Sequence, residues 1–249
     1  TAMAKKYGFS HSTTDYRQIL SDTETNLVLI TTRHHQHAIQ VMQALQAGKH
    51  VFVEKPLALN ATALKDIISC YQQLAKPVTL TVGFNRRFSP HTQKIKQLLG
   101  AQPGPLNLVA TMNAGFIPAN VWVHDLKIGG GRIVGEACHF MDLLAYLAGS
   151  KIKSVCMNAM GLHPDAATDN ASILLQMENG SQGTIHYFSN GHKGYSKERL
   201  EVYSQNRTII MDNFRTTEAF GFNGFRKLKT RQDKGHQAQF QQLIARTAA

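Results

Sequence analysis

The stretch Gly48–Leu59, GKHVFVEKPLAL, decides the first part of the fold. Its run HVFV consists of strand formers and ends in two opposite charges, Glu54 and Lys55, followed by Pro56. A short continuous apolar run of this kind is typical of a parallel strand that is covered on both faces. Two interpretations of the charged end are open: a solvated surface turn, or a lysine held at the mouth of a ligand cleft.

The segments on both sides of this stretch alternate between strand and helix patterns. Before it, residues 26–31 (NLVLIT) form an apolar run of strand length, and residues 34–47 carry apolar side chains at helical spacing. After it, Asn60 can cap a helix that Pro77 ends, and residues 78–84 (VTLTVGF) predict a third strand. Strands and helices in this alternation predict a parallel, doubly wound sheet.

The pattern changes after residues 100–105 (GAQPGP), where we place a boundary between two domains. A glycine triplet at 129–131 opens a helix, and several strands then follow in succession, with a hairpin turn at Asn179–Gly180. We therefore expect an α/β fold. An incomplete Rossmann-type parallel sheet occupies residues 1–100, and an α+β domain with a large, mostly antiparallel open sheet occupies residues 101–249.

Composition and charge argue against several classes of protein. The 249 residues are 43% hydrophobic and 17% charged, and no apolar run approaches the roughly 20 residues of a membrane helix. The formal charge of +11 is scattered, apart from a cluster at 225–231 (FRKLKTR) that we interpret as a solvated face. Three widely spaced cysteines indicate reduced thiols. We expect a cytoplasmic protein that binds neither nucleic acid nor a membrane.

Ligands of open parallel sheets bind outside the carboxyl ends of the strands, and two polar segments fall there. Residues 31–37 (TTRHHQH) follow the first predicted strand, and Glu54–Pro56 follows the second. This position favours the cleft interpretation of the opening stretch, and Pro56 holds Lys55 in an extended backbone. The histidines of the first segment lack the i, i+4 spacing of a helical zinc site, so we expect no metal there.

The helix after the glycine triplet carries a second group of polar side chains. Glu136, His139 and Asp142 recur every three residues along one flank. Glu136 and His139 are then neighbours, and the carboxylate can orient an imidazole that acts as a general base. A half-buried histidine with a structural salt link explains the same spacing, and for this helix alone it is the simpler interpretation.

Together these features resemble the Gfo/Idh/MocA family of nicotinamide-dependent oxidoreductases. The turn T-x-x-x-x-H at Thr32–His37, the segment AGKHVFVEKPLA at 47–58 and the glycine triplet before a His- and Asp-bearing helix occur in the family's order and spacing. The stretches GFNRRFSP, NAGFIPANVWVHD, GGGRIVGEACHFMDLLAYLAG and QDKGH are similar to a subgroup found in surface-polysaccharide gene clusters. Members of that subgroup are sometimes fused to a zinc-type alcohol dehydrogenase module.

The resemblance implies hydride transfer between NAD or NADP and a hydroxyl of a sugar, sugar nucleotide or cyclitol. It also implies a dinucleotide-binding domain, then a domain for substrate and oligomerisation, in a homodimer or homotetramer. Lys55 would polarise the reacting hydroxyl, and His139 would accept its proton with Glu136 nearby. The implied contacts are Thr31, Thr32, Arg33, His37, Glu54, Lys55 and Pro56 for the cofactor, and Arg86, Trp122, His124 and Asp142 for the substrate.

Two features depart from the family pattern. Gly135 stands where the family usually has Asp, four residues before the helix histidine, and Glu136 follows one residue later. The glycine fingerprint of the first Rossmann turn is absent, so we expect a fragment that lacks one strand–helix–strand unit and stops inside a helix.

Three alternatives to a dehydrogenase stay open. One is an NAD-dependent glycosidase of the same superfamily. Another is a non-catalytic, sugar-binding or regulatory relative, since a fold alone does not establish an activity. The third is a fragment that cannot hold the cofactor by itself. The presence of both Lys55 and His139 argues against the non-catalytic relative, because a binding protein needs neither group.

Overall fold

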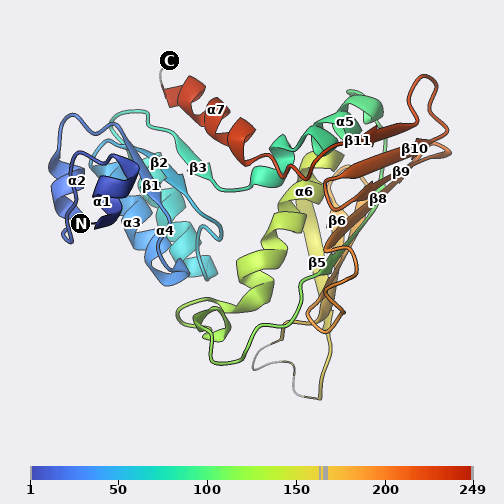
Figure 1. The fold of residues 1–249 in the computed structure, drawn as a ribbon, viewed down its shortest axis with the longest axis horizontal. Helices are drawn as coiled ribbons and strands as arrows, with labels where there is room; N and C mark the ends of the chain where they lie inside the picture. The colour runs from blue at the N-terminus through green and yellow to red at the C-terminus, as the bar shows by residue number, and fades with distance from the viewer. Residues whose placement is uncertain (1, 163, 165–167, 248–249) are drawn as a thin grey trace.

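In the computed structural model, which describes residues 2–162, 164 and 168–247, the chain forms two β-sheets of different kinds (Figure 1). The elements of the first part are α1 (Ala2–Tyr7), α2 (Arg17–Ser21), β1 (Leu27–Ile30), α3 (His34–Gln46), β2 (His50–Val53), α4 (Ala61–Gln72), β3 (Leu80–Val82), the 3-10 turn η1 (Asn85–Phe88) and α5 (Pro90–Leu99). The elements of the second part are β4 (Asn107–Asn113), the 3-10 turn η2 (Trp122–His124), the π-helical turn η3 (Ile133–Ala137), α6 (Cys138–Ala148), β5 (Ile152–Ala159), β6 (Ala171–Met177), β7 (Gln182–Phe188), β8 (Glu198–Ser204), β9 (Arg207–Asp212), β10 (Thr216–Phe220), β11 (Lys227–Lys229) and α7 (His236–Thr247).

The first sheet has the strand order β1-β2-β3, with both neighbouring pairs parallel. Its two crossover helices, α3 and α4, pack on one face, where Val51 and Val53 of β2 join their buried side chains in a common core. The side chain of Phe52, between these two valines, points to the opposite face, as the two-residue period of a strand requires. The alternation of strand and helix patterns therefore predicts the parallel strand order correctly, whereas the predicted doubly wound arrangement is not seen in the described part of the chain, because both crossover helices lie on one face.

The cap of α4 follows the prediction in detail. The Asn60 side-chain oxygen accepts a hydrogen bond from the backbone N–H of Ala63 at 2.9 Å, which satisfies one of the free donors at the start of the helix. The helix ends at Gln72, earlier than Pro77 requires. The Tyr71 hydroxyl then donates to the carbonyl of Val78 at 2.9 Å and fastens the return to β3.

The second sheet contains eight strands in the order β11-β10-β9-β8-β4-β7-β6-β5. Among the described strand pairs, β4 and β7 are parallel and their neighbours are antiparallel. Helices α5 and α6 cover one face of this sheet, where Phe140, Leu143 and Leu147 of α6 enter a core shared with β4, β6, β7 and β8 (Figure 1). The predicted fold class, a Rossmann-type parallel sheet followed by a mostly antiparallel open sheet, is confirmed.

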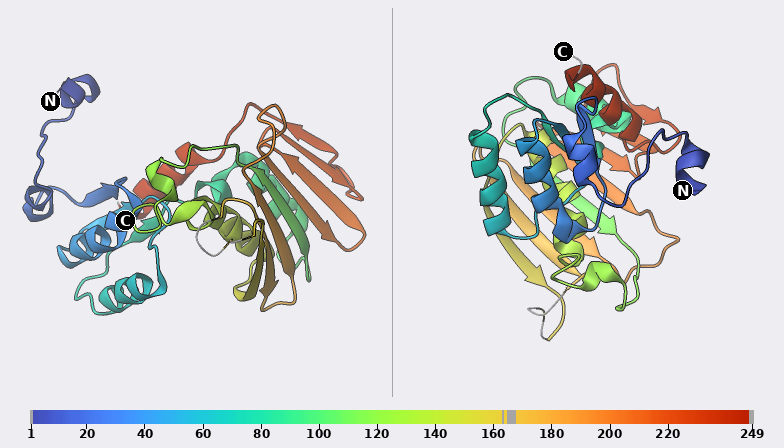
Figure 2. Two further views of the ribbon diagram at one scale, coloured as in Figure 1. Left: turned by 90° about the horizontal axis from the view of Figure 1, so that it is seen from below. Right: turned by 90° about the vertical axis from the view of Figure 1, so that its left-hand side faces the viewer.

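The last helix, α7, returns to the first sheet. Its Phe240 ring lies 4.9 Å from the ring of Phe52, measured between centroids, and Gln239 donates through Nε2 to the carbonyl of Val82 at 3.2 Å. Figure 2 shows α7 beside the first sheet, on the side that faces the rest of the chain. The domain boundary at residues 100 and 101 stays a prediction. Helix α7 follows this boundary in the sequence, but it packs against β2 and β3, which precede the boundary.

None of the helices in the described ranges combines the length and the apolar composition that crossing a membrane requires.

Candidate active site

The carboxyl ends of β1, β2 and β3 lie side by side at one edge of the first sheet. The backbone N–H of Glu54 donates to the carbonyl of Ile30 at 2.9 Å, and the N–H of Gly83 donates to that of Val53 at 2.8 Å. The Glu54 side chain crosses over Gly83 so closely that a Cβ atom there would come within 3.0 Å of Glu54 Oε2. The residues after each strand therefore gather where parallel sheets bind ligands.

The turn after β1 is fastened to the turn after β2 by a buried histidine. His37 is fully buried, and its Nδ1 and Nε2 lie 2.8 Å and 2.9 Å from the carbonyl oxygens of Pro56 and Thr32. Thr32 donates from its hydroxyl to Gln40 at 2.7 Å, and Thr31 and Arg33 are exposed. The structure thus brings the predicted cofactor residues of both turns to one edge, with His37 joining the two turns rather than facing solvent.

Lys55 links this edge to the helix of the second part. Its Nζ atom donates to the carbonyl of Gly135 at 2.7 Å, across 80 residues of sequence. The two residues lie on the wall of a cavity of about 260 Å³. The wall of this cavity includes His34, Lys55, Trp122, Arg132, Gly135 and Glu136.

His139 lies at the start of α6 with only 7% of its surface exposed. Its Nδ1 atom is buried and has no hydrogen-bond partner among the described residues. Burial lowers the pKa of His139 well below its ordinary value, and nearby positive charges, first those of Arg86 and Lys55, lower it further. The imidazole is therefore neutral near pH 7 and has a nitrogen free to accept a hydrogen bond.

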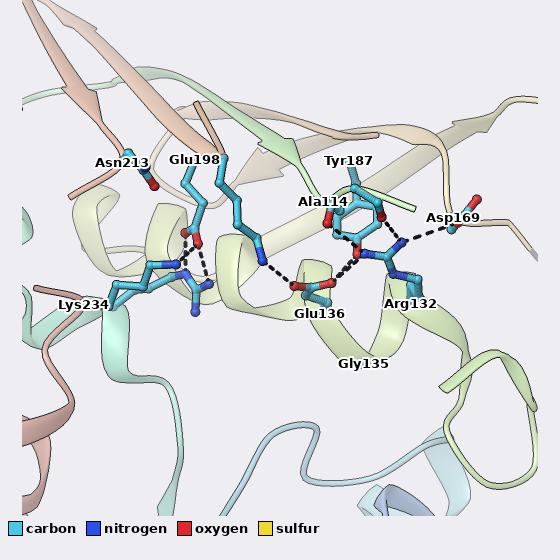
Figure 3. A network of polar contacts seen from close by, with 12 residues as sticks. Ala114, Arg132, Gly135, Glu136, Asp169, Tyr187, Glu198, Asn213 and Lys234 are labelled. Atoms are coloured by element: carbon cyan, nitrogen blue, oxygen red, sulfur yellow. Dashed lines mark hydrogen bonds and ion pairs between the residues drawn. The ribbon is translucent and has the colours of Figure 1, made fainter. Parts of the chain in front are cut away.

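Glu136 does not pair with His139, and this expectation needs correction. Its carboxylate accepts from Arg132 at 3.3 Å and from the hydroxyl of Tyr187, and Lys197 lies 3.8 Å from its other oxygen (Figure 3). The physical reason is the π-helical turn η3, whose wider turn removes the stacking that α-helical spacing gives to residues three apart. Glu136 still lines the cavity, from a different network of partners.

Arg132 is the centre of that network, although it is not among the site residues predicted from the sequence. It is 3% exposed, donates to the carbonyl of Gly115 at 2.7 Å and lies 3.5 Å from a carboxylate oxygen of Asp169 (Figure 3). Its position four residues before Glu136 is the spacing of a helical ion pair, so a signal was available. The contacts of this network with Tyr187 and Asp169 join residues that are far apart in the sequence, so no local pattern predicts them.

Two residues predicted to contact substrate are held in ion pairs. Arg86 donates twice to the carboxylate of Glu198, at 2.8 Å and 3.0 Å, and the Lys234 ammonium donates to the same carboxylate at 2.5 Å (Figure 3). Asp142 accepts two hydrogen bonds from Arg87, one of them at 2.6 Å. The structure places neither Arg86 nor Asp142 on the cavity wall, and their contact with substrate stays a prediction.

The other two predicted substrate residues lie on η2. Trp122 lines the cavity, and its ring meets the His34 ring edge-on at 4.9 Å between centroids, with the Arg33 guanidinium 5.7 Å from the indole centroid. His124 is not among the lining residues, and its Nε2 lies 3.2 Å from the carbonyl oxygen of Ile117, which does line the cavity. Within the described ranges no group of three or more His, Cys, Asp or Glu side chains is arranged to hold a metal ion.

The glycine triplet allows its backbone to lie very close to the backbone of η2. A Cβ atom at Gly129 would lie 2.6 Å from the Trp122 carbonyl oxygen and 2.6 Å from two backbone atoms of Val123. Gly130 and Gly131 both have φ of 75°, a region that glycine adopts without strain. The loop packs against η2, and the backbone N–H of His35 donates to the carbonyl of Ile128 at 3.1 Å.

We expect Gly129→Ala to lower the free energy of unfolding by about 1–3 kcal/mol, because the added methyl group has no space beside η2. Since Trp122 is the sole tryptophan of the chain, its fluorescence reports the same displacement. Urea unfolding followed by tryptophan emission measures both. Gly194→Ala is the control, because its new Cβ atom meets only the side chain of His192, at 3.0 Å. Equal stability of the two variants would contradict this role of Gly129.

Comparison with known proteins gives two adjoining family matches. The model described as "Oxidoreductase family, NAD-binding Rossmann fold" matches residues 1–84, and the model of the "GFO/IDH/MocA C-terminal domain" matches residues 92–210. The chain is 30% identical over 220 residues to the uncharacterized oxidoreductase YrbE of Bacillus subtilis, and 28% identical over 223 residues to myo-inositol 2-dehydrogenase of Thermotoga maritima. These alignments cover 86% of this chain, but 63% and 65% of the two relatives.

Among solved structures, the chain is similar to levoglucosan dehydrogenase in complex with NADH and levoglucosan. The TM-score is 0.79 at 23% sequence identity, and the superposition covers 94% of this chain and 70% of the other. This likeness shows a shared fold.

Proposed function

The chain belongs to the Gfo/Idh/MocA family of oxidoreductases, and on this premise we propose that it transfers a hydride between NAD or NADP and a hydroxyl of a sugar, sugar nucleotide or cyclitol. The single observation that carries the proposal is the meeting of Lys55 with the helix that bears His139. An ammonium group from the edge of the parallel sheet and a neutral, unpartnered imidazole from α6 are the two groups that oxidation of a hydroxyl requires.

The residues present fit the reacting end of a nicotinamide cofactor. Lys55 lies at the carboxyl edge of a parallel sheet and on the cavity wall, and His139, which does not line this cavity, lies near enough for the charge of Lys55 to lower its pKa. The exposed side chains of Thr31 and Arg33, together with Glu54, would hold the cofactor along the same edge. When it is bound, the nicotinamide supplies the acceptor or the donor of the hydride.

The chain's own residues orient the hydroxyl and move its proton. Lys55 exchanges its hydrogen bond with the Gly135 carbonyl for one to the oxygen of the reacting hydroxyl, which stabilises negative charge on that oxygen. His139 accepts the proton of the same hydroxyl. The cations that lower the pKa of His139 disfavour an imidazolium ion, so the ring releases this proton to solvent water, and the oxidation yields one hydride for the nicotinamide and one proton for the solvent.

The substrate class rests on the relatives. Myo-inositol 2-dehydrogenase and levoglucosan dehydrogenase are named for a cyclitol and an anhydrosugar, which supports a carbohydrate or cyclitol for this chain. We also propose that residues 1–100 bind the dinucleotide, that residues 101–249 bind substrate and mediate a homodimer or homotetramer, and that the protein is cytoplasmic and binds no nucleic acid. The family matches at 1–84 and 92–210 support that division.

The experiment that tests the function is a titration with NADH and NADPH, followed by an assay of NAD⁺ and NADP⁺ reduction with a panel of sugars and cyclitols. Saturable binding and net formation of reduced nicotinamide support a dehydrogenase. Release of reducing sugar without net formation of NADH supports the glycosidase instead. Absence of cofactor binding removes the proposed activity from this chain.

The pH dependence of turnover tests the environment of His139. Because burial and the neighbouring cations lower its pKa, the ring stays neutral as the pH falls through the ordinary histidine range. We therefore expect kcat/KM, which reports groups of the free enzyme, to show no acid limb near about pH 6.5. A limb there that disappears in His139→Gln would show that this histidine titrates normally and would contradict the assignment.

A further inference from the structure

His34 lies on the cavity wall beside Gly135, the position at which the family usually has Asp. A Cβ atom built on Gly135 would come within 3.1 Å of His34 Cε1 and 3.5 Å of His34 Nδ1. A side chain at position 135 and the ring of His34 therefore compete for the same space. Because Gly135 has no side chain, the imidazole of His34 occupies this space.

The hydrogen bond of His34 fixes its tautomer. Its Nδ1 lies 2.7 Å from the carbonyl oxygen of Gly129, and because a carbonyl only accepts, Nδ1 carries the proton. Burial lowers the pKa of His34, so the ring is neutral at pH 7. A neutral ring protonated at Nδ1 has an acceptor lone pair at Nε2, and this atom has no hydrogen-bond partner among the described residues.

The surroundings hold this acceptor in place and pair it with a second one. The edge-on contact with Trp122 and the bond to Gly129 restrain the ring at two points. On the same cavity wall, Glu136 Oε2 accepts hydrogen bonds from Arg132 and Tyr187, whereas Oε1 is in an ion pair with Lys197 at 3.8 Å, which is longer than a hydrogen bond. The wall thus offers two hydrogen-bond acceptors in addition to the donor Lys55.

We propose that His34 is a substrate-binding residue for a cyclic polyol, because its Nε2 accepts a hydrogen bond from a ring hydroxyl other than the one that reacts at Lys55. The inference deepens the proposed function and rests on it for the reacting hydroxyl. Glu136 Oε1 accepts a hydrogen bond from a further hydroxyl. A cavity of about 260 Å³ lies near the lower end of small-molecule sites, which fits one monosaccharide-sized ring.

Two conservative variants separate ligand binding from a structural role of His34. In His34→Asn, the side-chain amide can replace Nδ1 and keep the bond to Gly129, but it does not reach the position of Nε2. In His34→Gln, the longer amide places an acceptor near the position of Nε2 and gives up the Gly129 bond. A residue that binds polyol is rescued by glutamine, whereas a residue that only supports the loop is rescued by asparagine.

The measurement is isothermal titration calorimetry on the full chain, with and without saturating NADH. Myo-inositol and D-glucose are the neutral probes. We expect at least one neutral probe to bind, His34→Asn to weaken it by about tenfold, and His34→Gln to weaken it by much less. The reverse ranking, equal affinities in all three proteins, or no binding of either neutral probe overturns the proposal.

The failure of this inference is distinct from the failure of the proposed function. Polyol binding that depends on His34 without any NADH formation from NAD⁺ rejects the dehydrogenase and leaves the binding role of His34 intact. If NADH forms but His34→Asn binds the polyol more tightly than His34→Gln does, the dehydrogenase is supported and the role of His34 is rejected.

Discussion

Lys55→Ala is expected to lower turnover by about 10³-fold, the largest effect on activity among the substitutions considered. The side chain supplies the ammonium group at the junction between the parallel sheet and η3, where its hydrogen bond to Gly135 is the contact that substrate replaces. Removing it leaves the developing negative charge on the oxidised oxygen without a cation. The measurement is the steady-state rate of NAD⁺ or NADP⁺ reduction with the best sugar or cyclitol of the panel.

The fold should tolerate this change, because Lys55 is only half-buried and its described partner is a single carbonyl group. We expect the free energy of unfolding to change by less than about 1 kcal/mol. Lys65→Ala is the matched control: Lys65 is exposed on α4, and its loss should leave turnover unchanged. Turnover of Lys55→Ala equal to that of the control would remove Lys55 from the proposed chemistry.

Glu198→Gln is expected to destabilise the protein by about 3–5 kcal/mol. Glu198 is fully buried and is the shared counter-charge of Arg86, which is 7% exposed, and of Lys234, which is 20% exposed. The glutamine keeps the shape of the side chain and removes its charge, so two cations remain in a poorly solvated place. Because η1, β8 and the segment before α7 meet at this carboxylate, the loss affects contacts between both sheets (Figure 3).

Urea unfolding of Glu198→Gln beside Glu218→Gln provides the test. Glu218 pairs with Lys227 at 2.7 Å on the surface, where the two side chains are 42% and 51% exposed. Loss of such an exposed, solvent-screened pair is expected to leave the stability almost unchanged. A similar small cost in both variants would show that the buried carboxylate contributes no more than a surface pair.

The pH dependence of stability gives a second measure of the same carboxylate. Burial by itself raises the pKa of Glu198, but the charges of Arg86 and Lys234 outweigh this and hold the pKa below its ordinary value. A folded-state pKa below that of the unfolded chain contributes stability above about pH 4.3 and loses it as the pH falls through the folded-state pKa. The gap in stability between wild type and Glu198→Gln should therefore narrow in acid.

Much of the candidate site was predictable, because its residues follow the ends of local elements. The apolar runs of β1 and β2 placed Thr31, Glu54 and Lys55 at one edge of a parallel sheet, and the structure brings them there. The spacing of helix residues was a weaker guide. It predicted that Glu136 faces His139, but a single π-helical turn and a buried arginine redirect the carboxylate.

By itself, the sequence determined the order of strands and helices, the cap at Asn60, the parallel first sheet and the charged turn that ends β2. These features depend on hydrogen bonds and apolar spacing within a few residues, which a short pattern records. Only the tertiary structure decided which charges pair, as in the ion pair between Arg86 and Glu198, which are 112 residues apart. It also decided that α7 packs against β3 and that His34 occupies the space left by Gly135. Such partners are chosen by packing between distant segments, where burial makes one arrangement of charges and shapes far more stable than the alternatives.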